Sequence, residues 1–207
     1  MAYFPDRDQN FDGIKPVWHL EPDKKDVMGY KLDGADTMNG EVIYPGQPIK
    51  TDEKGKTAVL CKYAHVEAVS NDKKSVTVEP YHHLKAGDKV AISGEATLVE
   101  LTIKGVTDEG KTLTFASAIS SKAADALKDI VLVEVETKEG AVKAKNVPNR
   151  IVNAKAKIDS IHKTCSAAHA GVVVQNFVFY PAEYLNESLF PGTILLAGCP
   201  SLMFIYQ

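Results

Sequence analysis

The residues best suited to bind a metal are His162, Cys165 and His169, which follow one another closely in the chain. Zinc in proteins needs three or four nitrogen or sulfur ligands at about 2.0–2.3 Å. The spacing of these three residues matches no established zinc motif, and His82 and His83 could join them only through the fold. We therefore favour structural or surface roles for these histidines, and we expect no metal and no other cofactor.

Other reactive side chains give no stronger signal. A cysteine nucleophile needs a histidine beside it and a third group that orients the histidine. Cys61 and Cys199 occur in apolar, strand-like sequence, where a cysteine is usually a small buried hydrophobic residue, and nothing near Cys165 marks it as activated. Paired carboxylates occur in DEKG, TDEG and KEG, which read as solvated turns. With no phosphate-binding glycine loop and no hydrolase motif in the sequence, the residues predict no enzymatic reaction and no catalytic residue.

Composition places the chain among ordinary folded proteins. It has 207 residues, of which 44% are hydrophobic and 25% are charged. The formal net charge is −3 and lysines are mixed with acids throughout, so we expect neither nucleic acid nor an anionic membrane as a partner. The N-terminus carries acids and a proline, and the apolar stretches fall short of the ~20 residues of a membrane span. We expect synthesis in a cytoplasm without secretion.

The elements that would position these side chains are mostly strands. AVSNDKKSVTVE (68–79) and GVTDEGKTLTFA (105–116) have the same pattern of residue types. In their alignment Ser75 matches Thr112 and Thr77 matches Thr114. Each reads as two strands around a polar turn, and the period of two predicts one buried face. Two copies do not establish a solenoid, which needs three or more units. They predict a mainly β fold, a small β-barrel or sandwich built of hairpins.

The rest of the chain suggests three parts. Residues 1–40 carry scattered aromatics, prolines and glycines without periodicity, and predict an extended N-terminal arm. Residues 41–140 would form the β-barrel or sandwich, with one short helix near 119–129. Residues 141–207 would form a C-terminal β-rich region that packs on this domain or on a partner. Both the arm and the apolar C-terminus could pack on the chain itself or on a neighbouring subunit.

Residues 40–135 contain the stretches GEVIYPGQPIKTDEKGKTAVL, VEAVSNDKKSVTVEPYHHLKAGDKVAI and TLVELTIKGVTDEGKTLTFASAI. In these stretches the chain resembles the head-fibre and head-decoration (auxiliary capsid) proteins of tailed bacteriophages of the crAss-like type. The resemblance implies a non-enzymatic structural virion protein on the capsid surface, made in the host bacterial cytoplasm. It also implies binding to the major capsid protein, to other head-fibre or capsid proteins and to itself, as a dimer or trimer.

Aromatic side chains dominate the energetics of protein interfaces, so we expect the arm to supply the contacts with partners. The predicted partner-binding residues are Tyr3, Phe4, Phe11 and Trp18. An alternative function is a carbohydrate- or ligand-binding β module. Its binding platform would consist of Trp18, Tyr81, His82 and His83.

Overall fold

The computed structural model describes residues 17–18, 24–25, 29–79, 82–119, 130–174, 180–187 and 193–205. In these ranges the structure is mainly β, with several sheets and no helix of seven or more residues, which confirms the predicted fold class. The helical elements are short 3-10 turns: η1 (Ala35–Thr37), η2 (Asp108–Gly110) and η4 (Ala182–Tyr184). The helix predicted near 119–129 lies outside the described residues, apart from Ile119.

The chain forms two compact units. The first comprises Met1–Cys61, Asn146–Phe179 and Tyr184–Gln207, and the second comprises Lys62–Lys145 and Tyr180–Glu183. These units differ from the predicted ranges 1–40, 41–140 and 141–207. The difference arises because the strands within residues 41–61 pair with strands of the first unit rather than with the hairpins.

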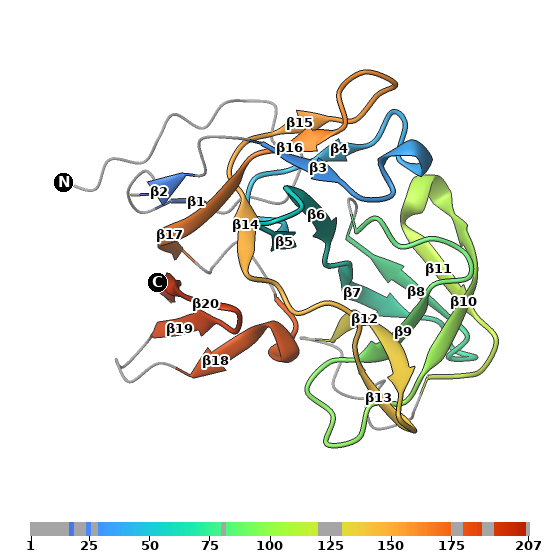
Figure 1. Ribbon diagram of the computed structural model, residues 1–207. Coiled ribbons are helices and arrows are strands. Elements are labelled where there is room, and N and C mark those ends of the chain that lie inside the picture. The colour runs from blue at the N-terminus through green and yellow to red at the C-terminus, as the bar shows by residue number, and fades with distance from the viewer. Residues whose placement is uncertain are drawn as a thin grey trace. The chain divides into compact units, whose positions relative to one another are not determined.

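The second unit is a closed barrel. Its strands are β7 (Tyr63–Val69), β8 (Ser75–Val78), β9 (Lys89–Ile92), β10 (Leu101–Thr107), β11 (Thr112–Phe115), β12 (Val131–Lys138) and β13 (Ala141–Ala144). They pair in the order β12-β7-β8-β11-β10-β9, and β9 pairs again with β12, so the ring has no open edge (Figure 1). Every pairing in the ring is antiparallel, and β13 is added to β12 outside it.

The two repeated segments form the two predicted hairpins, β7–β8 and β10–β11. Their second strands pair with each other, with Val76 opposite Leu113 and Ser75 opposite Thr114. Val76 and Leu113 are also the residues that correspond when the two copies are aligned. The hairpins are therefore related by a local two-fold axis that passes between these two residues.

Irregularities of the hairpins obey the same symmetry. The register of the first hairpin shifts between Val66 and Ala68, and that of the second shifts between Ile103 and Gly105, the corresponding positions. The hydrogen bonds that join the hairpins at their ends also correspond. The amide N–H of Val78 donates to the carbonyl oxygen of Lys111 at 2.8 Å, and that of Phe115 donates to the carbonyl oxygen of Lys74 at 2.8 Å. The sequence repeat is thus a repeat of structure down to its bulges.

Side chains from both hairpins fill the barrel. Along β8 and β11 the buried residues alternate with half-exposed Ser and Thr, as the period of two predicts. Leu84, from the turn before β9, also lies in the interior. The buried core consists of Ala64, Val66, Val76, Val78, Leu84, Val90, Leu101, Ile103, Leu113, Phe115, Ile119, Ile130 and Leu132.

The first unit has a larger mixed sheet. Its order is β16-β3-β6-β5-β14-β17-β20-β19-β18, with β3–β6 and β17–β20 parallel. These strands are β3 (Tyr30–Leu32), β5 (Pro48–Asp52), β6 (Thr57–Leu60), β14 (Arg150–Val152), β16 (Thr164–Cys165), β17 (Ala167–Val174), β18 (Leu185–Glu187), β19 (Thr193–Leu196) and β20 (Cys199–Ile205). A separate pair is formed by β4 (Val42–Ile43) and β15 (Ala156–Lys157).

Segments from both terminal regions of the chain lie in this sheet. The C-terminal strand β20 lies between β17 and β19, with Leu202 and Phe204 fully buried. From the N-terminal segment, β1 (Val17–Trp18) and β2 (Lys24–Lys25) both pair antiparallel with β17. The described parts of the predicted arm are thus attached to the chain's own sheet.

We expect Leu113→Ala to lower the free energy of unfolding of the barrel by about 3 kcal/mol, because it removes a fully buried side chain on the two-fold axis. Amide hydrogen exchange of the barrel strands would measure this change. Lys104→Ala, at an exposed position of β10, is the matched control and should stay within about 0.5 kcal/mol. A Leu113 variant as stable as this control would contradict the assigned core.

Candidate functional site

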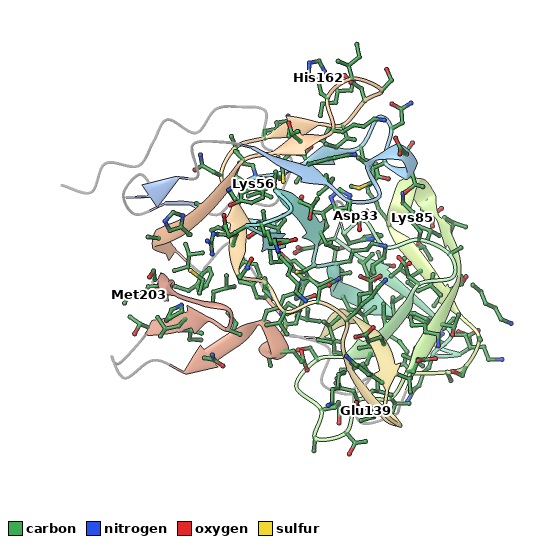
Figure 2. All side chains as sticks on the ribbon, viewed as in Figure 1. Asp33, Lys56, Lys85, Glu139, His162 and Met203 are labelled. Carbon is green, nitrogen blue, oxygen red and sulfur yellow. The ribbon has the colours of Figure 1, made fainter. Side chains whose placement is uncertain are left out.

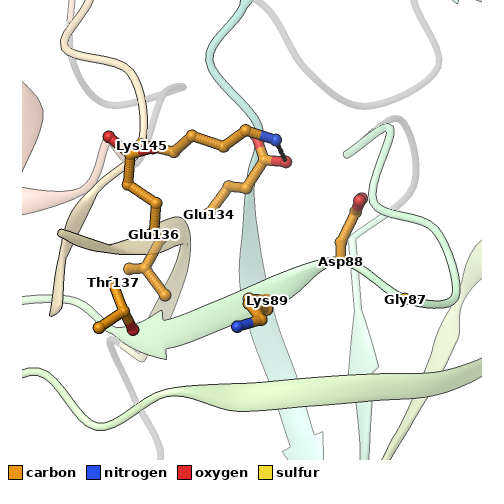
Figure 3. A pocket seen from close by; sticks show the side chains of 8 residues that line it. Gly87, Asp88, Lys89, Glu134, Glu136, Thr137 and Lys145 are labelled. Atoms are coloured by element: carbon orange, nitrogen blue, oxygen red, sulfur yellow. Dashed lines mark hydrogen bonds and ion pairs between the residues drawn. The ribbon is translucent and has the colours of Figure 1, made fainter.

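A pocket of about 300 Å³ lies at the seam of the barrel, where β9 meets β12 (Figure 3). The second half of β12 forms one wall and the turn before β9 forms another. The residues that line the pocket are Gly87, Asp88, Lys89, Glu134, Val135, Glu136, Thr137 and Lys145. Charged groups of both signs therefore meet at the place where the ring closes.

Glu134 is the centre of this charge cluster. It is only 3% exposed, although a carboxylate removed from water is unfavourable unless it is paired. Lys145 Nζ donates to Glu134 Oε1 at 2.9 Å, and Lys62 Nζ lies 3.6 Å from the same oxygen. Lys62 also donates to Asp88 at 2.7 Å. Lys62, the residue before β7, thus links Glu134 of β12 with Asp88 in the turn before β9. Lys145, which follows β13, pairs with Glu134 as well.

This arrangement limits the chemistry of the pocket. The hydrogen bond from Lys145 to Glu134 raises the pKa of the Lys145 ammonium above its usual range. Lys145 therefore stays protonated near neutral pH and is a poor nucleophile or base. Asp88 Oδ2 also accepts a hydrogen bond from the amide N–H of Lys85 at 2.8 Å, so this carboxylate stabilises the turn before β9. The cluster stabilises the seam rather than forming an acid–base pair.

We expect Glu134→Ala to destabilise the barrel by about 1–2 kcal/mol, because it removes the counter-charge of Lys145 and leaves Lys62 paired with Asp88 alone. Glu136→Ala lines the same pocket at an exposed position and is the matched control, with a change within about 0.5 kcal/mol. Amide hydrogen exchange in β9 and β12 would report both changes. Equal stability of the two variants would exclude a structural role for Glu134.

A short segment far along the chain completes the barrel unit. Tyr180 packs against Tyr63 with ring centroids 5.8 Å apart, and burial raises the pKa of both hydroxyls. The carboxylate of Glu183 accepts hydrogen bonds from the Ser93 hydroxyl at 2.6 Å and from the Gly94 amide at 3.0 Å. The Ala182 amide also donates to Ser93 Oγ at 2.7 Å, so an aromatic contact and three hydrogen bonds hold the segment Tyr180–Glu183 on the barrel.

His82, a member of the predicted ligand platform, has a structural role. Its Nδ1 accepts a hydrogen bond from the Leu84 amide at 2.9 Å, so Nε2 carries the proton and donates to the Gly110 carbonyl oxygen at 2.6 Å. The residue is 9% exposed and braces the turn of the second hairpin. Tyr81 and the side chain of Trp18 lie outside the described residues, so the platform stays a prediction.

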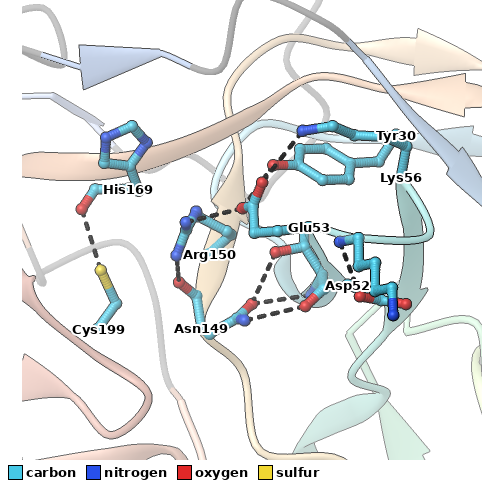
Figure 4. Close-up of polar contacts among 10 residues, drawn as sticks. Tyr30, Asp52, Glu53, Lys56, Asn149, Arg150, His169 and Cys199 are labelled. Atoms are coloured by element: carbon cyan, nitrogen blue, oxygen red, sulfur yellow. Dashed lines mark hydrogen bonds and ion pairs between the residues drawn. The ribbon is translucent and has the colours of Figure 1, made fainter.

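The three metal-ligand candidates do not converge. The His162 side chain is 74% exposed, and its Nδ1 lies 2.9 Å from Asp159. Cys165 is 2% exposed in the core of the first unit, and burial raises the pKa of its thiol to about 11. The carbonyl oxygen of His169 accepts a hydrogen bond from the Cys199 thiol at 3.0 Å (Figure 4). Across the described ranges, no group of three His, Cys, Asp or Glu side chains is placed to hold a metal ion.

Cys61 and Cys199 are also buried, and neither they nor Cys165 form a disulfide. Of the predicted partner-binding residues, Tyr3, Phe4 and Phe11 lie outside the described residues. Trp18 is described by its backbone alone, which pairs with Val173 in β17.

A polar network in the first unit was missed by sequence reasoning (Figure 4). Glu53 Oε1 accepts hydrogen bonds from the Tyr30 hydroxyl at 2.7 Å and from Arg150 at 2.9 Å, and Lys56 donates to Glu53 Oε2 at 3.2 Å. The bond from Tyr30 is the main cause of the lowered pKa of Glu53. In the sequence, DEKG reads as a solvated turn, whereas the structure uses its glutamate to join β3, β14 and the turn after β5.

Comparisons with protein-family models, with curated proteins and with solved structures find no match to this chain. In the described part of the chain, no helix is long and apolar enough to span a membrane.

Proposed function

We propose that the protein is a non-enzymatic structural component of a tailed-phage head, a head fibre or capsid decoration protein. It binds the major capsid protein and further copies of itself. The observation that carries the proposal is that side chains capable of chemistry are used to hold the fold together. The cysteines are buried, His82 braces a turn and Glu134 closes the barrel seam. The resemblance of residues 40–135 supports the assignment to a phage head.

The N-terminal segment supplies the proposed contacts with the capsid. Its backbone is attached to β17 at Val17–Trp18 and again at Lys24–Lys25. Tyr3, Phe4 and Phe11 precede the first of these attachments, so they are joined to a fixed point of the first unit. Aromatic residues of this kind are the usual anchors of protein interfaces.

The proposal is tested with purified protein and phage heads assembled without it. Replacing Tyr3, Phe4 and Phe11 by alanine should weaken binding to the heads at least about tenfold, because it removes the proposed aromatic anchors. Co-sedimentation over a range of protein concentrations measures this change. The matched control replaces Asp6, Asp8 and Asn10, polar residues of the same segment, by alanine, and should bind like the wild type.

Three results would contradict the proposal or part of it. Wild-type protein that does not bind heads, and that antibody labelling does not find on the mature particle, would exclude a virion role. Saturable binding to one sugar on a glycan array would instead favour the carbohydrate-binding module, because an architectural protein has no sugar preference. Equal binding by the aromatic and polar triple variants would exclude the segment as the anchor.

A further inference from the structure

The turn between η1 and β4 contains Asn39-Gly40, the only place in the sequence where an asparagine precedes a glycine. Both residues are exposed, and the segment that leads to them starts after Asp33 (Figure 2). An asparagine before a glycine is chemically reactive, because the glycine has no side chain to hinder the approach of its backbone nitrogen to the asparagine side chain. The exposed position leaves room for this chemistry and for the water that it consumes.

The reaction is deamidation, and water is its only co-reactant. The backbone nitrogen of Gly40 loses its proton and forms a bond to Cγ of Asn39. The bond from Cγ to the side-chain nitrogen breaks, and this nitrogen takes up the proton through water and leaves as ammonia. Water then opens the resulting succinimide ring at either carbonyl carbon. One product is aspartate at position 39, and the other is isoaspartate, in which the main chain runs through Cβ and Cγ.

The native turn opposes this attack in two ways. The amide N–H of Gly40 donates to the carbonyl oxygen of Ile158 at 2.8 Å, so the attacking nitrogen is engaged. The amide N–H of Glu41 donates to the carbonyl oxygen of Met38 at 2.9 Å and closes the turn. φ is 87° at Gly40 and is not positive at Asn39, as in a type II turn. Ring closure needs the Gly40 nitrogen beside Asn39 Cβ, and the ψ of about +120° at this position of a type II turn rotates it away.

The β4–β15 pair holds the turn in place. The bond from Gly40 to Ile158 and a return bond from the Ile158 amide to the Glu41 carbonyl oxygen, at 2.9 Å, continue the ladder between β4 and β15 (Figure 1). Ile43 in β4 and Ile158 after β15 are fully buried in the core of the first unit. Release of the Gly40 nitrogen therefore requires local opening of this core.

We propose that Asn39 is a deamidation site that the β4–β15 pair controls, so that it reacts only when the pair opens. Both products add a negative charge, and the loss of ammonia makes the change permanent. Isoaspartate also adds a carbon atom to the main chain of the turn, which shifts the Gly40 amide out of register with Ile158. An opening of the first unit is thus recorded in the chain as a covalent change.

The test follows deamidation of the full chain by mass spectrometry, under native conditions and in urea at the same pH and temperature. Cleavage after Lys31 and Lys50 releases a peptide whose only asparagine is Asn39. We expect Asn39 to react at least about tenfold more slowly in the native protein than in the unfolded chain. Equal rates would overturn the proposal, and so would an unfolded chain in which Asn39 does not react.

Ile158→Ala examines whether the β4–β15 pair is the controlling element. This variant removes a fully buried side chain, which favours the opened state, and should raise the native deamidation rate at least about tenfold. The matched control is Ile161→Ala in the loop that follows, at a position that is 82% exposed, and it should react at the wild-type rate. Equal rates in the two variants would contradict control by the pair.

Hydrogen exchange of the Gly40 amide in the wild type gives a measure that does not depend on whether Ile158→Ala folds. Exchange and deamidation both require the Gly40 nitrogen to leave Ile158 and to lose its proton. The fold should therefore slow both reactions by the same factor relative to the unfolded chain. A Gly40 amide that exchanges as fast as in the unfolded chain, while Asn39 still reacts slowly, would overturn the role of the pair.

Discussion

The barrel depends on the pairing of β8 with β11. A single two-stranded hairpin is at best marginally stable in water, and each repeated segment makes only one. By pairing their second strands around Val76 and Leu113, the two hairpins become one sheet with a continuous apolar face. β9 and β12 then complete the ring by pairing with the outer strands and with each other. The corresponding bulges in both hairpins allow the sheet to curve in the same way on both sides of the axis.

Closure of the ring has a consequence for function. The interior is filled by aliphatic side chains and one aromatic ring, Phe115, and the carboxylate at the seam is balanced by two lysines. The polar side chains that would be reactive in an open pocket hold strands together instead. Under the proposed function, partners contact the outside of the molecule, where Tyr3, Phe4 and Phe11 precede the attachment of the N-terminal segment to β17.

The sequence was sufficient to predict the elements whose pairing depends on residues close together in the chain. The alternation in SVTV and TLTF and the polar turns before them were sufficient to predict both hairpins, because each strand finds its partner nearby. The sequence could not show which unit residues 41–61 belong to. Their strand β5 pairs with β14, which lies much later in the chain, and no local pattern encodes that partner. Glu134 interrupts the apolar run IVLVEV, and this was the available signal for a buried charge. Of its partners, Lys62 is distant in sequence and Lys145 is 11 residues away, and in the sequence both resemble ordinary surface lysines.

The central claim is that the two hairpins form one cooperative barrel around a shared axis. The amides of Val78 and Phe115, which donate across the junction between the hairpins, report on it most directly. Hydrogen exchange of the full chain should show both amides exchanging at the same slow rate, and only through unfolding of the whole barrel. If one of these amides exchanged through a separate local opening, much faster than the other, the hairpins would be independent elements and the account would be wrong.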